Sequence, residues 1–210
     1  MKTVIIESNN PLSWYFIADS ALINAGKPFF IPEFADEFEA FLAPVVRISR
    51  IGKSIASRFA GRYYEEIAPA IHFRASALRR QLLEAGLPAD PSHSFDRSMT
   101  VGSFIPAEKM LSGAPLVMEL SKSTSITDRH LDAEAGPIPT GETADKMEVE
   151  CPAEELRESV GPILEAVSKT NTIKMGDFIV PVLSAPLKVE IGDTLTVTQG
   201  SETLLNVQIR

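Results

Sequence analysis

The C-terminal third of the sequence alternates short apolar runs with glycine turns, which is the pattern of antiparallel β structure. One Gly-Asp pair precedes Phe178-Ile179-Val180, and a second precedes residues 194–198, where threonine alternates with leucine and valine. Gly200-Ser201 then predicts a turn into a last strand over 204–209. Two further strands are predicted earlier, over 45–50 and 116–120.

Apolar residues that recur at helical spacing predict helices over 54–67, 75–85 and 153–169. Gly86 suits the left-handed position at which the second helix would end. Gly161-Pro162 is expected to divide the third into two short helices, because proline removes a donor and clashes with the preceding turn. Residues 122–151 read as a long loop. The chain is therefore expected to be a single α+β, β-rich domain over 1–210.

Composition excludes several classes of protein. The formal net charge of −8 argues against nucleic acid, whose phosphates require a basic face. The one cysteine, Cys151, excludes an internal disulfide and a cysteine-based zinc cluster. The apolar run at the start is too short for a signal peptide, and no run approaches the roughly 20 residues of a membrane span. We expect a cytoplasmic protein with no nucleic-acid or membrane partner.

General catalytic motifs are absent from the sequence. It has no GxGxxG, no HExxH and no CxxC. Its three histidines, His72, His93 and His130, are too far apart in the chain to form a local metal motif. These motifs therefore identify no catalytic residue.

Taken in order, a series of short blocks resembles the fumarylacetoacetate hydrolase family, from about residue 15 to the end. Among them are Val45-Val46-Arg47-Ile48, Gly102-Ser103-Phe104-Ile105-Pro106 and Lys174-Met175-Gly176-Asp177. The full set covers 19–22, 26–32, 45–53, 62–67, 94–96, 101–106, 141–145 and 173–179. The resemblance implies a mixed β roll with short flanking helices and a homodimer.

The resemblance also implies a Mg²⁺ or Mn²⁺ site built from a Glu-x-Glu pair and an Asp, which serves hydrolysis or isomerisation of 2-keto and acylpyruvate-type acids. Counted back from Arg47, the Glu-x-Glu positions are Phe41 and Ala43 here, and the Asp position is His72. None of these is the hard oxygen ligand that such cations require. We therefore expect no metal cofactor and no catalytic residue of the family type.

Other parts of the family's site differ as well. The family arginine corresponds to Ser76, the lysine to His93, and the late Thr-Gly-Thr-Pro loop to residues 181–184. The resemblance implies that residues 1–14 are a truncated form of the family's lid segment, and residues 1–13 contain no histidine. The expected function is that of a non-catalytic or repurposed homologue, serving binding or structure.

Two alternatives stay open. One is a metal-free hydrolase or isomerase of a 2-keto or acylpyruvate-type acid. The other is a metal enzyme in a different register that uses Glu37, Glu39 or other acids, although Glu39 lies two residues before the first position of the pair. For a binding role, His72, Arg74 and His93 are the candidate ligand-binding residues, and a small organic acid or phosphate is the expected ligand. The competing interpretation is that Phe41 fills the cavity and His72 is packed in the core.

Overall fold

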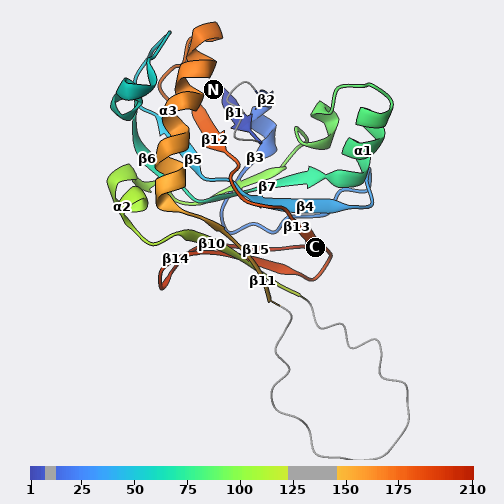
Figure 1. Cartoon of the computed structure of the whole chain (residues 1–210). Coiled ribbons are helices and arrows are strands. Elements are labelled where there is room, and N and C mark those ends of the chain that lie inside the picture. The colour runs from blue at the N-terminus through green and yellow to red at the C-terminus, as the bar shows by residue number, and fades with distance from the viewer. Residues whose placement is uncertain (8–12, 123–145) are drawn as a thin grey trace, which may run out of the picture.

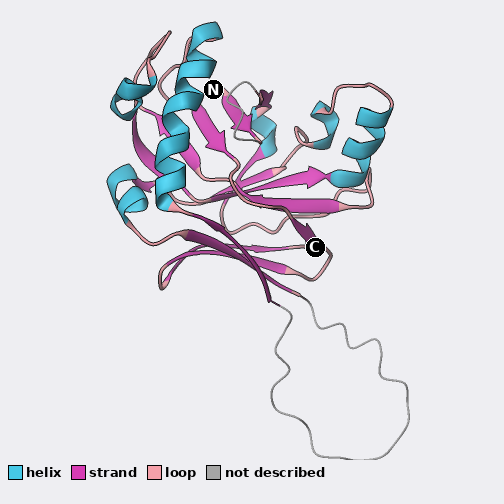
Figure 2. Ribbon diagram, viewed as in Figure 1, coloured by secondary structure: helices cyan, strands magenta, loops and turns pink. Residues whose placement is uncertain are grey.

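Three β-sheets pack against one another, with helices along their outer edges (Figures 1 and 2). The computed structural model describes residues 1–7, 13–122 and 146–210. The first sheet has the order β2 (Trp14–Ile17), β1 (Thr3–Ile6), β12 (Phe178–Pro181), β5 (Val45–Ile48), β6 (Tyr64–Ala68) and β9 (Ile105–Pro106). The second has the order β13 (Leu187–Val189), β4 (Phe38–Leu42), β7 (Ala70–Ala75), β8 (Met99–Val101) and β3 (Leu22–Asn24). The third is β11 (Lys146–Cys151), β10 (Leu116–Ser121), β14 (Thr194–Gln199) and β15 (Glu202–Gln208).

The helices lie at the margins of these sheets. The α-helices are α1 (Ser76–Glu84), α2 (Ala107–Ser112) and α3 (Ala153–Thr170). Three short 3₁₀ helices are η1 (Asp19–Ala21), η2 (Ser57–Arg62) and η3 (Asp90–Ser92). The long helix α3 packs against η2, β12 and α2, whereas α1 follows β7 directly at the other side of the molecule (Figure 1). No helix in the described ranges is long and apolar enough to cross a membrane.

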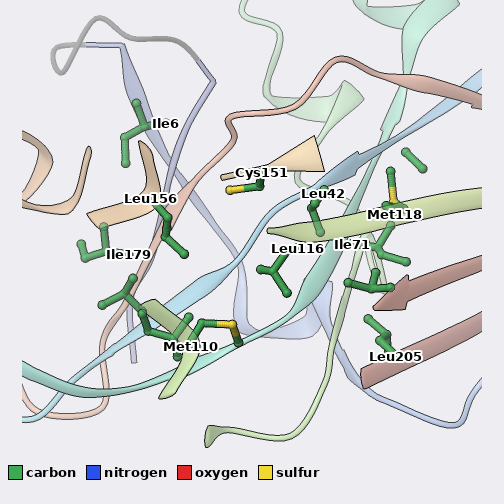
Figure 3. Packing of buried hydrophobic residues seen from close by; sticks show 14 of the residues in the cluster. Ile6, Leu42, Ile71, Met110, Leu116, Met118, Cys151, Leu156, Ile179 and Leu205 are labelled. Atoms are coloured by element: carbon green, nitrogen blue, oxygen red, sulfur yellow. The ribbon is translucent and has the colours of Figure 1, made fainter. Parts of the chain in front are cut away.

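The main hydrophobic core joins all three sheets to α3. Figure 3 shows Ile179 of the first sheet, Ile71 of the second and Met118 of the third in one cluster with Leu156 of α3. Cys151 is buried in the same cluster, where burial and the nearby Glu155 carboxylate raise the pKa of its thiol to about 12. A second, smaller core lies between the first and second sheets.

Strand β4 is buried on both faces, and this positions the site described below. Phe38, Ala40 and Leu42 belong to the main core, whereas Phe41 belongs to the second core. Successive side chains of a strand point to opposite faces, so the two sets divide by alternation. Strand β7 alternates in the same way, with Ile71 and Phe73 in the main core.

The fold class expected from the sequence is confirmed: the chain is a β-rich mixture of strands and helices. The strands expected near 45–50, 116–120, 178–180, 194–198 and 204–209 are all present. The expected helix over 75–85 is α1, and Gly86 ends it at a φ of 68°. Leu87 N–H bonds the Leu82 carbonyl oxygen at 2.8 Å, which is the long bond of a glycine-terminated helix end.

The helix expected over 54–67 is wrong. The segment forms η2 and then β6, which pairs with β5 through Val46 opposite Ile67. Ile55, Phe59, Tyr63 and Ile67 do have helical spacing. The end of the segment is nevertheless extended, because as β6 it forms the backbone hydrogen bonds of a strand pair with β5.

The expected break in the third helix is also wrong, because Pro162 lies inside a continuous α3. Leu156, Val160 and Leu164 are buried on both sides of the proline, so core packing holds the two halves in line. Gly161 lies against η2, where a Cβ atom would collide with the Ser57 hydroxyl. The expected loop over 122–151 gives way to strand β11 at its end, and residues 123–145 lie outside the described residues.

The Gly-Asp pairs form turns whose carboxylates satisfy backbone donors. Gly176 has a φ of 86°, and Asp177 is 3% exposed. The Asp177 carboxylate accepts the backbone N–H groups of Lys2 and Lys174, each at 2.8 Å. The ammonium of Lys2 lies 3.3 Å from the same carboxylate. One buried aspartate thus joins β1 to the start of β12.

We expect Asp177→Ala to lower the free energy of unfolding by about 3 kcal/mol, because two partly buried N–H groups and a lysine lose their acceptor. Urea unfolding followed by circular dichroism measures the change. Asp96→Ala is the control, since Asp96 is exposed and should change stability by less than about 0.5 kcal/mol. A loss of less than about 1 kcal/mol for Asp177→Ala would contradict the bridging role.

Candidate functional site

The pairing of β4 with β7 brings together the three positions that the family resemblance assigns to metal ligands. The two strands are antiparallel, with Phe41 directly opposite His72. Ala43 follows β4 and donates its N–H to the Ala70 carbonyl oxygen at 2.9 Å. Directly paired residues share a face, as do residues two apart on one strand. The positions therefore form one small surface, and they hold a phenyl ring, a methyl group and an imidazole.

This surface does not fit a hard divalent cation. Phe41 and Ala43 offer no ligand atom, and they are 5% and 0% exposed. His72 Nε2 lies 3.1 Å from the His93 carbonyl oxygen, which can only accept, so the ring carries its proton there. Within the described residues, no group of three or more histidine, cysteine, aspartate or glutamate side chains is placed to hold a metal ion.

Arg74 supplies the positive charge of this surface. It lies two residues from His72 on β7, directly opposite Glu39 of β4. Its guanidinium carbon is 4.3 Å from the centroid of the Phe41 ring, a cation–π contact. Its Nη2 lies 2.9 Å from Glu39 Oε2, and its Nη1 lies 3.1 Å from Glu7 Oε2. Both ends of the guanidinium thus bind carboxylates of the same chain.

Glu7, just after β1, is the acceptor on which three donors converge. Its Oε1 accepts the Tyr15 hydroxyl at 2.6 Å. Its Oε2 lies 3.1 Å from Arg74 and 3.6 Å from Arg79. Burial alone would raise the pKa of Glu7, but the Tyr15 hydrogen bond and the two arginines outweigh it and lower that pKa. Burial and the Glu7 charge raise the pKa of Tyr15, so the phenol keeps its proton.

The two histidines adjoin this cluster as neutral groups. Burial lowers the pKa of His72 to about 4, although the His93 carbonyl and Glu7 oppose the shift. Burial also lowers the pKa of His93, whose ring packs against that of Tyr15 with 3.8 Å between centroids and 34° between the ring planes. Neither ring nitrogen of His93 has a hydrogen-bond partner among the residues that the structure describes.

The structure thus brings His72, Arg74 and His93 together, as the sequence predicted, but gives them unequal roles. Only Arg74 is charged near neutral pH, and its charge is already matched by Glu7 and Glu39. The loop at 181–184 also reaches this region, where the Ser184 hydroxyl accepts the Leu42 N–H at 3.0 Å.

Sequence reasoning missed Glu7, Tyr15 and Arg79. Glu7 follows the apolar run Val4-Ile5-Ile6, and an acid that directly ends a buried strand is a usable signal. Arg79 carries no comparable signal, because it lies among the other polar residues of α1. The resemblance drew attention to β4 and β7, whereas Glu7 and Tyr15 come from the neighbouring first sheet.

A groove of about 350 Å³ opens beside Arg74 and Arg79. The rest of its lining comes from β4 and α1, namely Glu39, Ser76, Arg80, Leu83 and Glu84. A second hollow, of about 450 Å³, lies by Leu22 and Phe104 and is lined mainly by apolar side chains and backbone. The first is the one that reaches the charged cluster.

No protein-family model matches the chain. No curated protein matches it either. In contrast, 73 chains of solved structures match it.

Three of these structures illustrate the similarity. A protein from Yersinia pestis CO92, described as a fumarylacetoacetate hydrolase family protein, has a TM-score of 0.73 at 17% identity and covers 100% of this chain and 92% of its own. Fumarylpyruvate hydrolase from Pseudomonas aeruginosa, solved with Mn²⁺ and pyruvate, has a TM-score of 0.73 at 15% identity, with coverages of 100% and 89%. A 5-carboxymethyl-2-hydroxymuconate delta-isomerase from Mycobacterium smegmatis has a TM-score of 0.71 at 16% identity, with coverages of 99% and 78%. The chain therefore has the fold of fumarylacetoacetate hydrolase family proteins.

We expect His72 to make the fold less stable as the pH falls from 6.5 toward 4. The folded-state pKa is about 4, against about 6.5 in the unfolded chain, so only the unfolded state binds the proton in this window. The loss should be about 2 kcal/mol at pH 5 and roughly 3 kcal/mol at pH 4, relative to pH 7.

Urea unfolding of the wild type and of His72→Gln at pH 7, 6 and 5 measures this effect. Other titrating groups contribute to both proteins, so the difference in slope isolates His72. The same dependence on pH in both proteins would show that His72 is not held neutral by burial.

Proposed function

We propose that this chain is a non-catalytic homologue of the fumarylacetoacetate hydrolase family, which uses its retained fold for binding. One observation carries the proposal: Arg74 lies over Phe41 and is neutralised by Glu7 and Glu39 beside the positions that the resemblance assigns to metal carboxylates. A fixed monovalent cation with its own counter-ions cannot supply the Lewis-acid chemistry of a divalent metal.

The donor atoms near these positions support the same interpretation. The alternative in a different register would use Glu37 or Glu39 as a ligand, yet Glu39 pairs with Arg74 at 2.9 Å and Glu37 lies 3.4 Å from Arg80. A metal at either carboxylate would have to compete with an arginine. A Mn²⁺ ion at the positions that the resemblance assigns to the metal ligands would meet Phe41, Ala43 and His72 here instead of carboxylates.

The second candidate function is a metal-free hydrolase or isomerase of a 2-keto or acylpyruvate-type acid. The observation that favours it is the hydrogen bond of 2.6 Å from the Tyr15 hydroxyl to Glu7 Oε1, because a phenol and a carboxylate could hold and pass a proton beside Arg74 and Arg79. Turnover of such acids without metal separates this candidate from the first.

We expect no tight binding of Mn²⁺ or Mg²⁺ and no hydrolysis of acylpyruvates. Purified protein is assayed by elemental analysis and by thermal shift with increasing Mn²⁺, and then with fumarylpyruvate with and without the metal. A fumarylpyruvate hydrolase serves as the positive control. Stoichiometric Mn²⁺, or a melting temperature that rises steadily with metal concentration, would refute the proposal. Turnover in the presence of a chelator would favour the second candidate.

We further propose that the chain forms a homodimer, the arrangement that the resemblance implies and the commonest closed oligomer. Light scattering at micromolar concentration should give a mass near twice 22.9 kDa. A mass of one chain at that concentration would contradict the dimer without affecting the argument about metal.

A further inference from the structure

Three donors from three separate elements enclose one carboxylate. Tyr15 belongs to β2, Arg74 to β7 and Arg79 to α1, and all three contact Glu7. Two guanidinium groups and a phenol are the kinds of donors with which proteins bind the carboxylate of a ligand. We refer to Tyr15, Arg74 and Arg79 as the carboxylate receptor.

The groove of about 350 Å³ described above opens onto the two arginines of the receptor, whereas Tyr15 and Glu7 lie behind them, outside its lining. Arg74 and Arg79 both line that groove, and the side chain of Arg79 is 30% exposed. A volume near 350 Å³ lies at the lower end of the range for small-molecule sites. The groove therefore suits a small acid rather than a large ligand.

Replacing Glu7 by an external carboxylate leaves the charge balance of the cluster unchanged. Arg74 and Arg79 are matched by Glu39 and Glu7, and an incoming carboxylate would take over the charge of Glu7 one for one. Arg74 keeps its contact with Glu39 throughout, so no arginine is left without an anion. Glu7 lies after the last residue of β1, outside the strand's ladder, and its departure breaks no pairing of the sheet.

From this geometry we propose that the carboxylate receptor is a binding site for small organic carboxylates, and that Glu7 fills it as an internal competitor. The inference rests on the proposed binding role and adds the residues, the ligand class and the regulation. It assigns Arg79 and Tyr15 to the site alongside Arg74. His72 and His93 are assigned a packing role at its base, since both are buried and neutral.

The first test measures acetate and succinate binding by calorimetry, in EDTA, to the wild type and to Glu7→Gln. The glutamine retains the side-chain length and an oxygen for Tyr15 but removes the competing charge. Glu7→Gln should bind these acids at least tenfold more tightly than the wild type. Glu7→Gln combined with Arg79→Gln should lose that gain, because the receptor then lacks one of its two cations.

Glu108→Gln is the matched control. It removes one exposed carboxylate of α2 that lies outside the groove and contacts no member of the receptor, so affinity should change by less than about threefold. Equal affinities for the wild type and Glu7→Gln, or a gain that survives the loss of Arg79, would overturn the inference. Tighter binding of phosphate than of acetate would overturn the assignment to carboxylates. Any of these results would leave the proposed absence of metal chemistry standing, because that is tested separately with Mn²⁺.

A second readout uses the wild type, so it does not depend on the folding of a variant. Trp14 is the chain's one tryptophan and precedes Tyr15 in β2. Displacement of Glu7 from Tyr15 should change its fluorescence as acetate is raised to about 100 mM at constant ionic strength. Arg79→Gln should abolish the change. An unchanged wild-type spectrum over this range would show that Glu7 is not displaceable.

Discussion

A largely buried guanidinium, held between two glutamates and a phenyl ring, organises this site. Arg74 is 15% exposed and rests on the Phe41 ring, and an unpaired charge in such a place costs several kcal/mol. The β4–β7 register supplies Glu39 as one counter-ion from the directly opposite position. Glu7 supplies the second from the first sheet, so neutralising one arginine also joins two sheets.

In this site the carboxylates are paired with arginines, whereas in a metal centre they would be available to bind a cation. Hard cations need several oxygen ligands that are free to face them, whereas the glutamates here already face arginines. The two neighbouring imidazoles are kept neutral by burial and add no ligand charge. The fold alone therefore does not carry over the chemistry of its structural neighbours, and the function has to be argued from these side chains.

Much of the fold could be predicted because its signals are local. The Gly-Asp turns, the alternation in 194–198 and the glycine that ends α1 each depend on a few neighbouring residues. The errors arose where a distant segment decided the outcome. Residues 54–67 follow a helical spacing, yet part of this segment pairs with β5, and Pro162 stays helical because α3 is held against the core.

The candidate site likewise contains residues that local sequence predicts and residues that only the packing of distant segments brings together. Arg74 and His72 could be placed on one face because they lie two apart on a strand, and the structure brings His93 to them. The convergence of Glu7, Tyr15 and Arg79 could not be foreseen, because it depends on how two sheets and α1 pack. Ion pairs between residues of different sheets produce no local pattern in a single sequence.

A neutralised arginine lies beside the positions that the family resemblance assigns to metal ligands. A crystal soaked in Mn²⁺ and measured at the manganese absorption edge tests it most directly. We expect no anomalous peak between Phe41, Ala43 and His72, with the Arg74 guanidinium lying between Glu7 and Glu39. A strong anomalous peak at that position, with Arg74 turned away from both glutamates, would contradict it.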